Sequence, residues 1–231
     1  MGLKLEKVVP WGRSLHEYLS MFHLTARECQ LQILDCAGGP SSFNVEMTRQ
    51  GNQVLSCDPI YQFSPEEISQ RIQETYHVIV EGVKAHSDSY LWLNFESPEQ
   101  LGQVRMATMQ QFLEDLPVGL TEGRYLTAEL PVLPFAERQF DLALCSHFLF
   151  TYSDHFSEQF HLKSIQELCR VAQEVRIFPL LNISGELSPL LSPLLQTLTE
   201  QGYSLEIEAV EYEFQKGGNQ MLRVRTEQSY Q

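Results

Sequence analysis

Short apolar runs alternate with amphipathic stretches along most of the chain. The runs cover approximately 31–35, 53–57, 124–128, 140–145 and 174–178, and each has the length of a buried strand. Between them, apolar residues recur at three- and four-residue spacing, which is typical of helices with one buried face. Strands that alternate with helices in this way predict a parallel sheet with helical crossovers.

Capping residues mark where several helices begin and end. Ser14 and Glu17 form a capping-box pattern at the start of the first helix, and Gly51 is placed to stop the second. Pro193 fits the first position of a late helix, which Gly202 would end. Further helices are predicted over 43–50, 157–172 and 193–201.

The end of the chain differs from the preceding repeat of strand and helix. Segments 205–214 and 220–225 alternate as strands and are joined through Lys216-Gly-Gly-Asn219, which predicts an antiparallel hairpin. The predicted fold is therefore α/β: a doubly wound, mostly parallel seven-stranded sheet with a C-terminal antiparallel hairpin. A helical insertion is expected between its second and third strands.

Residues 64–120 are too long for an ordinary crossover between two parallel strands. Ser64-Pro-Glu-Glu67 and Ser97-Pro-Glu-Gln100 each predict a helix start, and the second helix is expected to end near Pro117 and Gly119. We therefore interpret residues 1–231 as a single domain that contains a helical lobe at 64–120, over the carboxyl edge of the sheet. The alternative is one long crossover helix with a surface ornament.

Composition excludes several classes of function. The chain has 30 acidic and 16 basic residues, a net charge of −14, so a broad nucleic-acid interface is not expected. No apolar run approaches the ~18 residues of a membrane-spanning helix, and the first residues lack an apolar signal region. A soluble cytoplasmic protein without membrane contact is expected. The five cysteines lack C-x-x-C spacing and are predicted to be reduced core thiols.

Candidate chemistry gathers where the predicted parallel strands end. Asp35-Cys-Ala-Gly-Gly-Pro-Ser41 provides small residues after the first strand, and Asp58 follows the second. Glu129-Leu130 and Ser146-His147 follow the third and fourth strands. In an open parallel sheet, ligands bind outside these carboxyl ends. The Gly-x-Gly-x-x-Gly and Gly-Lys-Ser/Thr patterns are absent, which disfavours a dinucleotide or P-loop site.

The segment Ile33-Leu-Asp35-x-Ala37-x-Gly39-x-Ser41 resembles motif I of the class I S-adenosylmethionine-dependent methyltransferases. Val54-Leu-Ser-Cys-Asp58-Pro resembles that family's second-strand acid, and Glu129-Leu-Pro-Val-Leu-Pro-Phe135 with Phe140–His147 resembles its later motifs. The resemblance implies a sheet flanked by helices whose last strand is antiparallel. It departs from the family at Ala37 and Ser41, where glycines are usual, and at Glu129, where Asp is more common.

This resemblance implies S-adenosyl-L-methionine as the cofactor. The implied cofactor-binding residues are Asp35, Ala37, Gly38, Gly39, Asp58, Pro59, Glu129, Leu130 and Ser146. Asp35 would lie near the amino acid end of the cofactor, Asp58 would bind the ribose, and Glu129 would accept from the adenine amine. Arg13 and Tyr18 could close over the cofactor carboxylate. A loop anchor for Asp35, an Asx-turn for Asp58, a solvated acid for Glu129 and ordinary packing for Arg13 and Tyr18 remain the structural alternatives.

A sulfonium methyl group is already activated, so catalysis needs mainly alignment and exclusion of water. If the acceptor carries a proton, His147 is the candidate catalytic base. Packing or cofactor contact is the structural alternative for this residue, and Tyr152, Asp154 and His155 are further candidate bases. The spacing of the histidines does not predict a metal site.

Three functions remain open from the sequence. The leading hypothesis is methyl transfer to a small-molecule, non-nucleic-acid acceptor held between the 64–120 lobe and the sheet edge. A nicotinamide-dependent oxidoreductase on a similar sheet is the second. The third is a non-catalytic interaction module with a degenerate methyltransferase fold. Ala37 and Ser41, in place of the usual glycines, are consistent with this third hypothesis. The sequence predicts neither the acceptor nor the oligomeric state.

Overall fold

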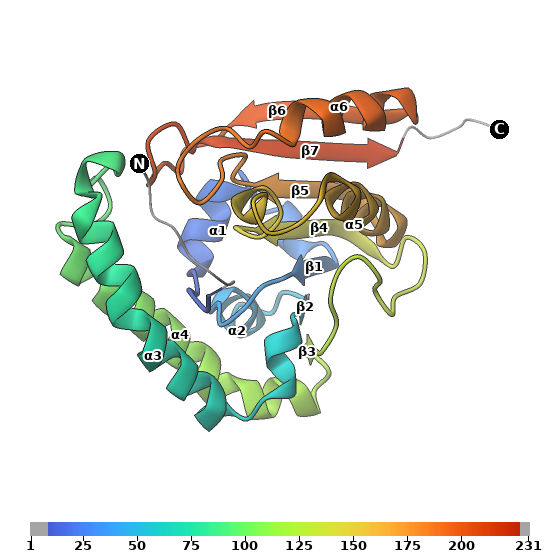
Figure 1. Cartoon of the computed structure of the whole chain (residues 1–231). Helices are drawn as coiled ribbons and strands as arrows, with labels where there is room; N and C mark the ends of the chain where they lie inside the picture. Colours follow the sequence, from blue (N-terminus) through green and yellow to red (C-terminus); the bar gives the residue numbers. More distant parts are fainter. Residues whose placement is uncertain (1–8, 227–231) are drawn as a thin grey trace.

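A computed structural model describes residues 9–226 as one seven-stranded sheet with helices on both faces (Figure 1). The strands are β1 (Ile33–Cys36), β2 (Val54–Cys57), β3 (Tyr125–Leu126), β4 (Phe140–Ser146), β5 (Ala172–Phe178), β6 (Tyr203–Ala209) and β7 (Gln220–Thr226). The α-helices are α1 (Leu15–Met21), α2 (Phe43–Arg49), α3 (Pro65–Ala85), α4 (Pro98–Thr121), α5 (Glu158–Val171) and α6 (Leu191–Glu200). The remaining residues of the predicted 1–231 domain, 1–8 and 227–231, lie outside the described part.

The strands follow the order β3-β2-β1-β4-β5-β7-β6. Neighbours from β3 to β5 pair in parallel, whereas β7 is antiparallel to both β5 and β6. Strand order reverses at β1, which pairs with β2 on one side and β4 on the other. The predicted doubly wound, mostly parallel sheet with a C-terminal antiparallel pair is confirmed.

Alternate residues of the central strands supply two separate cores. Leu34 and Cys145 pack in the core that includes residues of α5 and α6, whereas Ile33, Leu142 and Leu144 pack in the core that includes residues of α1 and α2. Because both faces are covered, the strands are apolar almost throughout. All five cysteines are free and buried, as expected for core thiols. No helix within residues 9–226 combines the length and apolarity needed to cross a bilayer.

Helices α3 and α4 occupy the segment between β2 and β3 and run side by side, on the side toward which β5 points (Figure 1). The capping box of Ser64 and Glu67 is present, and Ser97 Oγ accepts from the Gln100 N–H at 3.1 Å. Helix α4 ends at Thr121, two residues beyond Gly119, close to the end that the sequence predicted near Pro117 and Gly119. A proline this close to the end removes one main-chain hydrogen bond, while Leu116 beside it remains fully buried. Whether 64–120 is a separate lobe stays a prediction.

Two further helix and strand boundaries differ from the sequence predictions. Helix α6 begins at Leu191, so Pro193 is its third residue and not its first. Strand β6 ends at Ala209, although alternation predicted a strand to Phe214. The chain leaves the sheet because Tyr212 is buried and its hydroxyl donates to Glu17 at 3.0 Å. A tertiary contact therefore overrides the local strand pattern.

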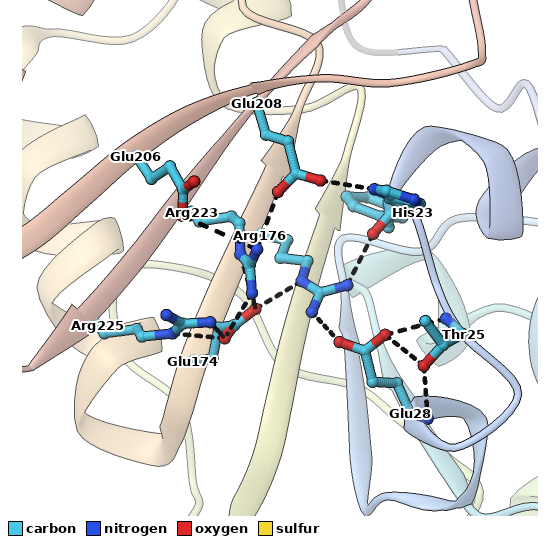
Figure 2. Close-up of polar contacts among 10 residues, drawn as sticks. His23, Thr25, Glu28, Glu174, Arg176, Glu206, Glu208, Arg223 and Arg225 are labelled. Atoms are coloured by element: carbon cyan, nitrogen blue, oxygen red, sulfur yellow. Dashed lines mark hydrogen bonds and ion pairs between the residues drawn. The ribbon is translucent and has the colours of Figure 1, made fainter.

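Charged side chains replace apolar ones on part of the sheet face that also carries α1 (Figure 2). Glu174 of β5 pairs with Arg176 on its own strand and with Arg223 and Arg225 of β7. Arg176, 3% exposed, also pairs with Glu28 and donates to the Phe22 carbonyl at 2.7 Å. These pairs tie the segment after α1 to the C-terminal strands.

Candidate active site

A cavity of about 640 Å³ lies at the carboxyl ends of the parallel strands. Its wall combines the loops after β1, β2, β3 and β4 with residues of α3, α4 and the segment before α1. Of the predicted site residues, those on the wall are Ala37, Gly38, Gly39, Asp58, Pro59, Glu129, Leu130, Ser146 and His147. The expectation that these strand ends meet at one place is therefore met, because parallel strands end at the same edge.

The loop after β1 is fixed by main-chain and side-chain contacts. The Ala37 N–H donates to the Cys57 carbonyl at 2.8 Å. Ala37 has φ +58° and Gly39 has φ +54°, so both lie in the left-handed region. A non-glycine residue in this region costs roughly 1–2 kcal/mol, so the backbone of Ala37 is strained. A Cβ on Gly38 would approach Asp35 Oδ2 to 2.2 Å, so only glycine fits there.

Asp58 joins this loop to the segment after β2. Its Oδ2 accepts from the Gly39 N–H at 3.0 Å, and its Oδ1 accepts from the Ile60 N–H at 2.8 Å. The second bond is the turn-forming role expected before Pro59, and the first leaves the carboxylate on the cavity wall. Burial raises the pKa of Asp58 to about 6 despite both hydrogen bonds, and the negative charge of Glu129 adds to the rise. Each carboxylate oxygen retains capacity for a further donor.

Asp35 lies beneath the loop and not on the cavity wall. It is 1% exposed and accepts from Tyr18 Oη at 3.0 Å and from Ser56 Oγ at 2.9 Å. Burial raises the pKa of Asp35 to about 7, although both hydrogen bonds act in the opposite direction. Asp35 therefore links α1 to β2 through Tyr18 and Ser56, and its role beside the amino acid end of the cofactor stays a prediction.

His147 follows β4 directly and lies on the cavity wall with Ser146. Its φ is +50°, its N–H donates to the Phe178 carbonyl, and its Nδ1 lies 2.9 Å from Ser146 Oγ. Burial, together with the charges of Arg13 and Arg105, lowers the pKa of His147 well below its usual value. The imidazole is therefore neutral at physiological pH.

The other candidate bases are placed differently. Tyr152 lines the cavity, and its hydroxyl accepts from the Val9 N–H at 3.3 Å. Asp154 and His155 are exposed and are not part of the wall. Glu129 is exposed at the rim, whereas Leu130 beside it is buried. Within residues 9–226, no cluster of three histidine, cysteine, aspartate or glutamate side chains is arranged to hold a metal ion.

Three functional candidates were not found from the sequence: Arg105, Tyr212 and the buried role of Glu17. Arg105 of α4 is 1% exposed, and its two terminal guanidinium nitrogens bond to both carboxylate oxygens of Glu17. Burial alone would raise the pKa of Glu17, but the charge and hydrogen bonds of Arg105, with the charge of Arg13 and the hydrogen bond from Ser14, together outweigh it and the pKa falls to about 2. Arg105 lies between Leu101 and Met109 on the buried face of α4. A charged residue among apolar residues at helical spacing is the sequence pattern that could have indicated its buried role.

Comparisons with known proteins complement this geometry. No family model matches the chain. Magnesium protoporphyrin IX methyltransferase (ChlM) from Synechocystis PCC 6803 with bound SAM aligns at a TM-score of 0.44 and 14% identity, over 85% of this chain and 70% of that one. A TehB-like SAM-dependent methyltransferase from Corynebacterium glutamicum aligns at 0.46 and 16% identity, over 92% and 87%. Similarity at this level assigns no function.

The strand order is a firmer observation than these alignments. The antiparallel β7 between β5 and β6 is the arrangement that the methyltransferase resemblance implied, and the chain has this Rossmann-like fold. In sequence, the chain is 34% identical over 224 residues to the uncharacterized protein MJ0045 of Methanocaldococcus jannaschii. The alignment covers 96% of this chain and 98% of that protein. The chain therefore belongs to the same family as MJ0045.

Proposed function

We propose that the protein transfers a methyl group from S-adenosylmethionine to a small-molecule, non-nucleic-acid acceptor. The observation that carries the proposal is Asp58, a carboxylate held on the cavity wall beside the narrow loop of Ala37 to Gly39. A carboxylate in this position suits the two hydroxyls of a ribose. The Asp58 carboxylate and the adjoining small-residue loop therefore suit a nucleoside cofactor.

Other wall residues support the same ligand. The small side chains of Ala37, Gly38 and Gly39 leave the main chain accessible to a closely approaching group. Glu129 and Leu130 would lie against the base, and Pro59 and Ser146 would complete the wall around the ribose and the reacting end. When bound, S-adenosylmethionine supplies an activated methyl group on a positively charged sulfur.

The chain itself has three tasks in this proposal. The cavity walls, formed by the strand-end loops and by residues of α3 and α4, limit the access of water to the reacting atoms. The loops hold cofactor and acceptor in line, which alone accounts for a large part of the rate. Neutral His147 presents an imidazole that accepts a proton if the acceptor carries one. Its lowered pKa makes it a weak base, so it serves an acceptor whose proton is released readily.

Calorimetry with S-adenosylhomocysteine tests the proposal, with NAD⁺ as the comparison ligand. We expect saturable binding of S-adenosylhomocysteine, a matching rise in Tm, and neither effect with NAD⁺. Binding of NAD⁺ alone would support the oxidoreductase hypothesis instead. If neither ligand binds at millimolar concentration, the proposal fails and a non-catalytic module is favoured.

A further inference from the structure

The cavity wall beside α1 and α4 carries more positive than negative charge. Arg13 and Arg105 both line the cavity, and Glu17 is the carboxylate that pairs with Arg105. Both Glu17 oxygens are already engaged by Arg105, and one of them also accepts from Tyr212 Oη. Within residues 9–226, no carboxylate lies within 4.0 Å of Arg13, so one guanidinium charge is left uncompensated.

The hydrogen bonds of Arg13 are also incomplete. Its Nη1 donates to the Trp11 carbonyl at 3.0 Å, while its Nε is buried without a partner among residues 9–226. Arg105 Nε is likewise buried and unpartnered. Burial and the neighbouring Arg105 lower the pKa of Arg13, but a guanidinium remains charged near neutral pH. Arg13 as a whole is half-buried, and a guanidinium whose Nε is withdrawn from water without a partner gains from an anion that compensates its charge.

Arg71 lines the same cavity but pairs with Glu74, and apolar side chains make up most of the wall on the side of Arg13 and Arg105. Trp11, Ile79, Val83, Tyr90, Leu101 and Phe214 line the same cavity. Four of them, Ile79, Val83, Tyr90 and Leu101, belong to one buried cluster, against which Trp11 and Phe214 pack. They come from α3, α4 and the segments that precede α1 and follow α3 and β6, away from the strand-end loops assigned to the cofactor. This half of the cavity suits an apolar body with one anionic group.

We propose that the acceptor is an organic anion, a carboxylate on an aromatic or alicyclic body, whose carboxylate binds Arg13 beside the Arg105–Glu17 pair. The planar guanidinium can bind a carboxylate through two parallel hydrogen bonds. That the anion is the methyl acceptor rests on the proposed function, whereas the existence of an anion site at Arg13 does not. The carboxylate of the cofactor's amino acid end is the other possible source of the same chemistry.

The test compares matched carboxylates and carboxamides on the full-length chain. 2-Naphthoate and 4-phenylbutyrate are titrated against 2-naphthamide and 4-phenylbutyramide by calorimetry, with and without saturating S-adenosylhomocysteine. We expect the carboxylates to bind about tenfold more tightly or better, as hydrogen bonds to a charged partner imply. Arg13→Gln is expected to abolish this preference, and Arg49→Gln, at an exposed arginine outside the cavity, to retain it. Equal affinities, no binding of either series, or a preference that persists in Arg13→Gln would overturn the proposal.

A second arm identifies which anion Arg13 serves. S-adenosylhomocysteine and 5′-methylthioadenosine, which lacks the amino acid end, are titrated against wild type and Arg13→Gln. If Arg13 binds the acceptor, Arg13→Gln should change the affinities for S-adenosylhomocysteine and 5′-methylthioadenosine by less than about twofold. Selective loss of S-adenosylhomocysteine affinity would assign Arg13 to the cofactor and overturn the proposal. If neither nucleoside binds the wild-type protein, the methyltransferase proposal fails. The comparison of carboxylates with carboxamides in the absence of S-adenosylhomocysteine then still tests whether Arg13 forms an anion site.

Discussion

Two groups of charged residues in this molecule are arranged in opposite ways. On the β5–β7–β6 face, Glu174 is paired with three arginines, and His23 and Arg223 both bond to Glu208 (Figure 2). In the cavity, Asp58 has no cationic partner within residues 9–226 and Arg13 has no anionic one. Paired charges hold elements together, whereas unpaired charges on a cavity wall are candidate contacts for a ligand.

The pKa values follow the same division. Glu28 of the paired group has its pKa lowered to about 2, because hydrogen bonds from Thr25 and the charge of Arg176 outweigh burial. Asp58 on the cavity wall and Asp35 beneath the loop have their pKa values raised to about 6 and about 7, because burial dominates at both. The first kind of acid stabilises the fold when ionised, and the second destabilises it when ionised. Four substitutions or conditions test this contrast.

The largest effect is expected in the paired group. Glu174→Gln keeps the shape of the side chain but removes the negative charge that faces Arg176, Arg223 and Arg225. Leaving Arg176 with one fewer ionic partner in its buried position is expected to lower the free energy of unfolding by about 3 kcal/mol. Chemical denaturation measures the loss, and the affinity for S-adenosylhomocysteine should not change.

Glu206→Gln is the matched control on the same face. Glu206 is 60% exposed and lies 3.8 Å from Arg223, so its substitution should change the free energy of unfolding by less than about 0.5 kcal/mol. If the two variants are equally stable, burial is not what makes the pairing around Glu174 matter.

The second largest effect is expected from a substitution in the cavity, and it concerns ligand affinity and not the free energy of unfolding. Asp58→Ala removes the carboxylate proposed to bind the ribose, and two lost charge-assisted hydrogen bonds correspond to about a hundredfold weaker S-adenosylhomocysteine binding. Calorimetry measures the affinity, with Asp88→Ala as the control because Asp88 is exposed and outside the cavity. An unchanged affinity in Asp58→Ala would mean that the ligand binds elsewhere.

The pH dependence comes next in size. The folded chain binds protons at Asp58 and Asp35 at pH values where the unfolded chain has lost them, so this contribution to stability is greatest below about pH 4 and is lost as pH rises to about 7. A ligand that needs ionised Asp58 behaves in the opposite way. Its affinity should rise by about tenfold per pH unit below pH 6 and level off above pH 7.

Calorimetry between pH 5 and pH 8, in two buffers of different ionisation enthalpy, measures both the affinity and the proton released on binding. Asp58→Asn binds weakly and should show no such rise between pH 5 and pH 6. Because Asp35 and Asp58 influence each other, the observed midpoint belongs to the pair. A wild-type affinity that is constant from pH 5 to pH 7 would contradict a role for the ionised carboxylate.

The sequence predicted the strand-end half of the cavity residue by residue, but in the other half it named Arg13 and Tyr18 and missed Arg105 and Tyr212, for a physical reason. Asp58, Gly39, Glu129 and His147 follow strands, and parallel strands bring such positions to one edge whatever the details of packing. The Arg105–Glu17 contact joins residues 88 positions apart through the angle at which α4 docks, which no local pattern encodes.

Asp35 and the segment 210–214 show the same limit. Asp35 ends up beneath the loop and not on its surface, because Gly38 allows the chain to fold over the carboxylate. Residues 210–214 continue the alternation of a strand, yet the buried Tyr212 contact takes them off the sheet and brings Phe214 to the cavity wall. At Tyr212 a long-range contact overrides the local pattern, whereas at Asp35 the absence of a Cβ on Gly38 decides the packing.

The smallest effect concerns the strained loop that carries the site. Ala37→Gly removes a Cβ from a residue at φ +58°, which relieves roughly 1–2 kcal/mol, while the more flexible unfolded chain offsets about half of that gain. We therefore expect the free energy of unfolding to rise by about 0.5–1 kcal/mol. Ala107→Gly on the exposed side of α4 should instead lower it by about 1 kcal/mol, as for any helix interior. Thermal and chemical denaturation compare the two variants, and a loss of stability in both would show that Ala37 is not strained. If Ala37→Gly raises the free energy of unfolding and leaves the affinity for S-adenosylhomocysteine unchanged, the alanine lowers stability without serving the ligand. If binding weakens instead, the restricted backbone of the alanine holds the loop in the conformation that binds the ligand.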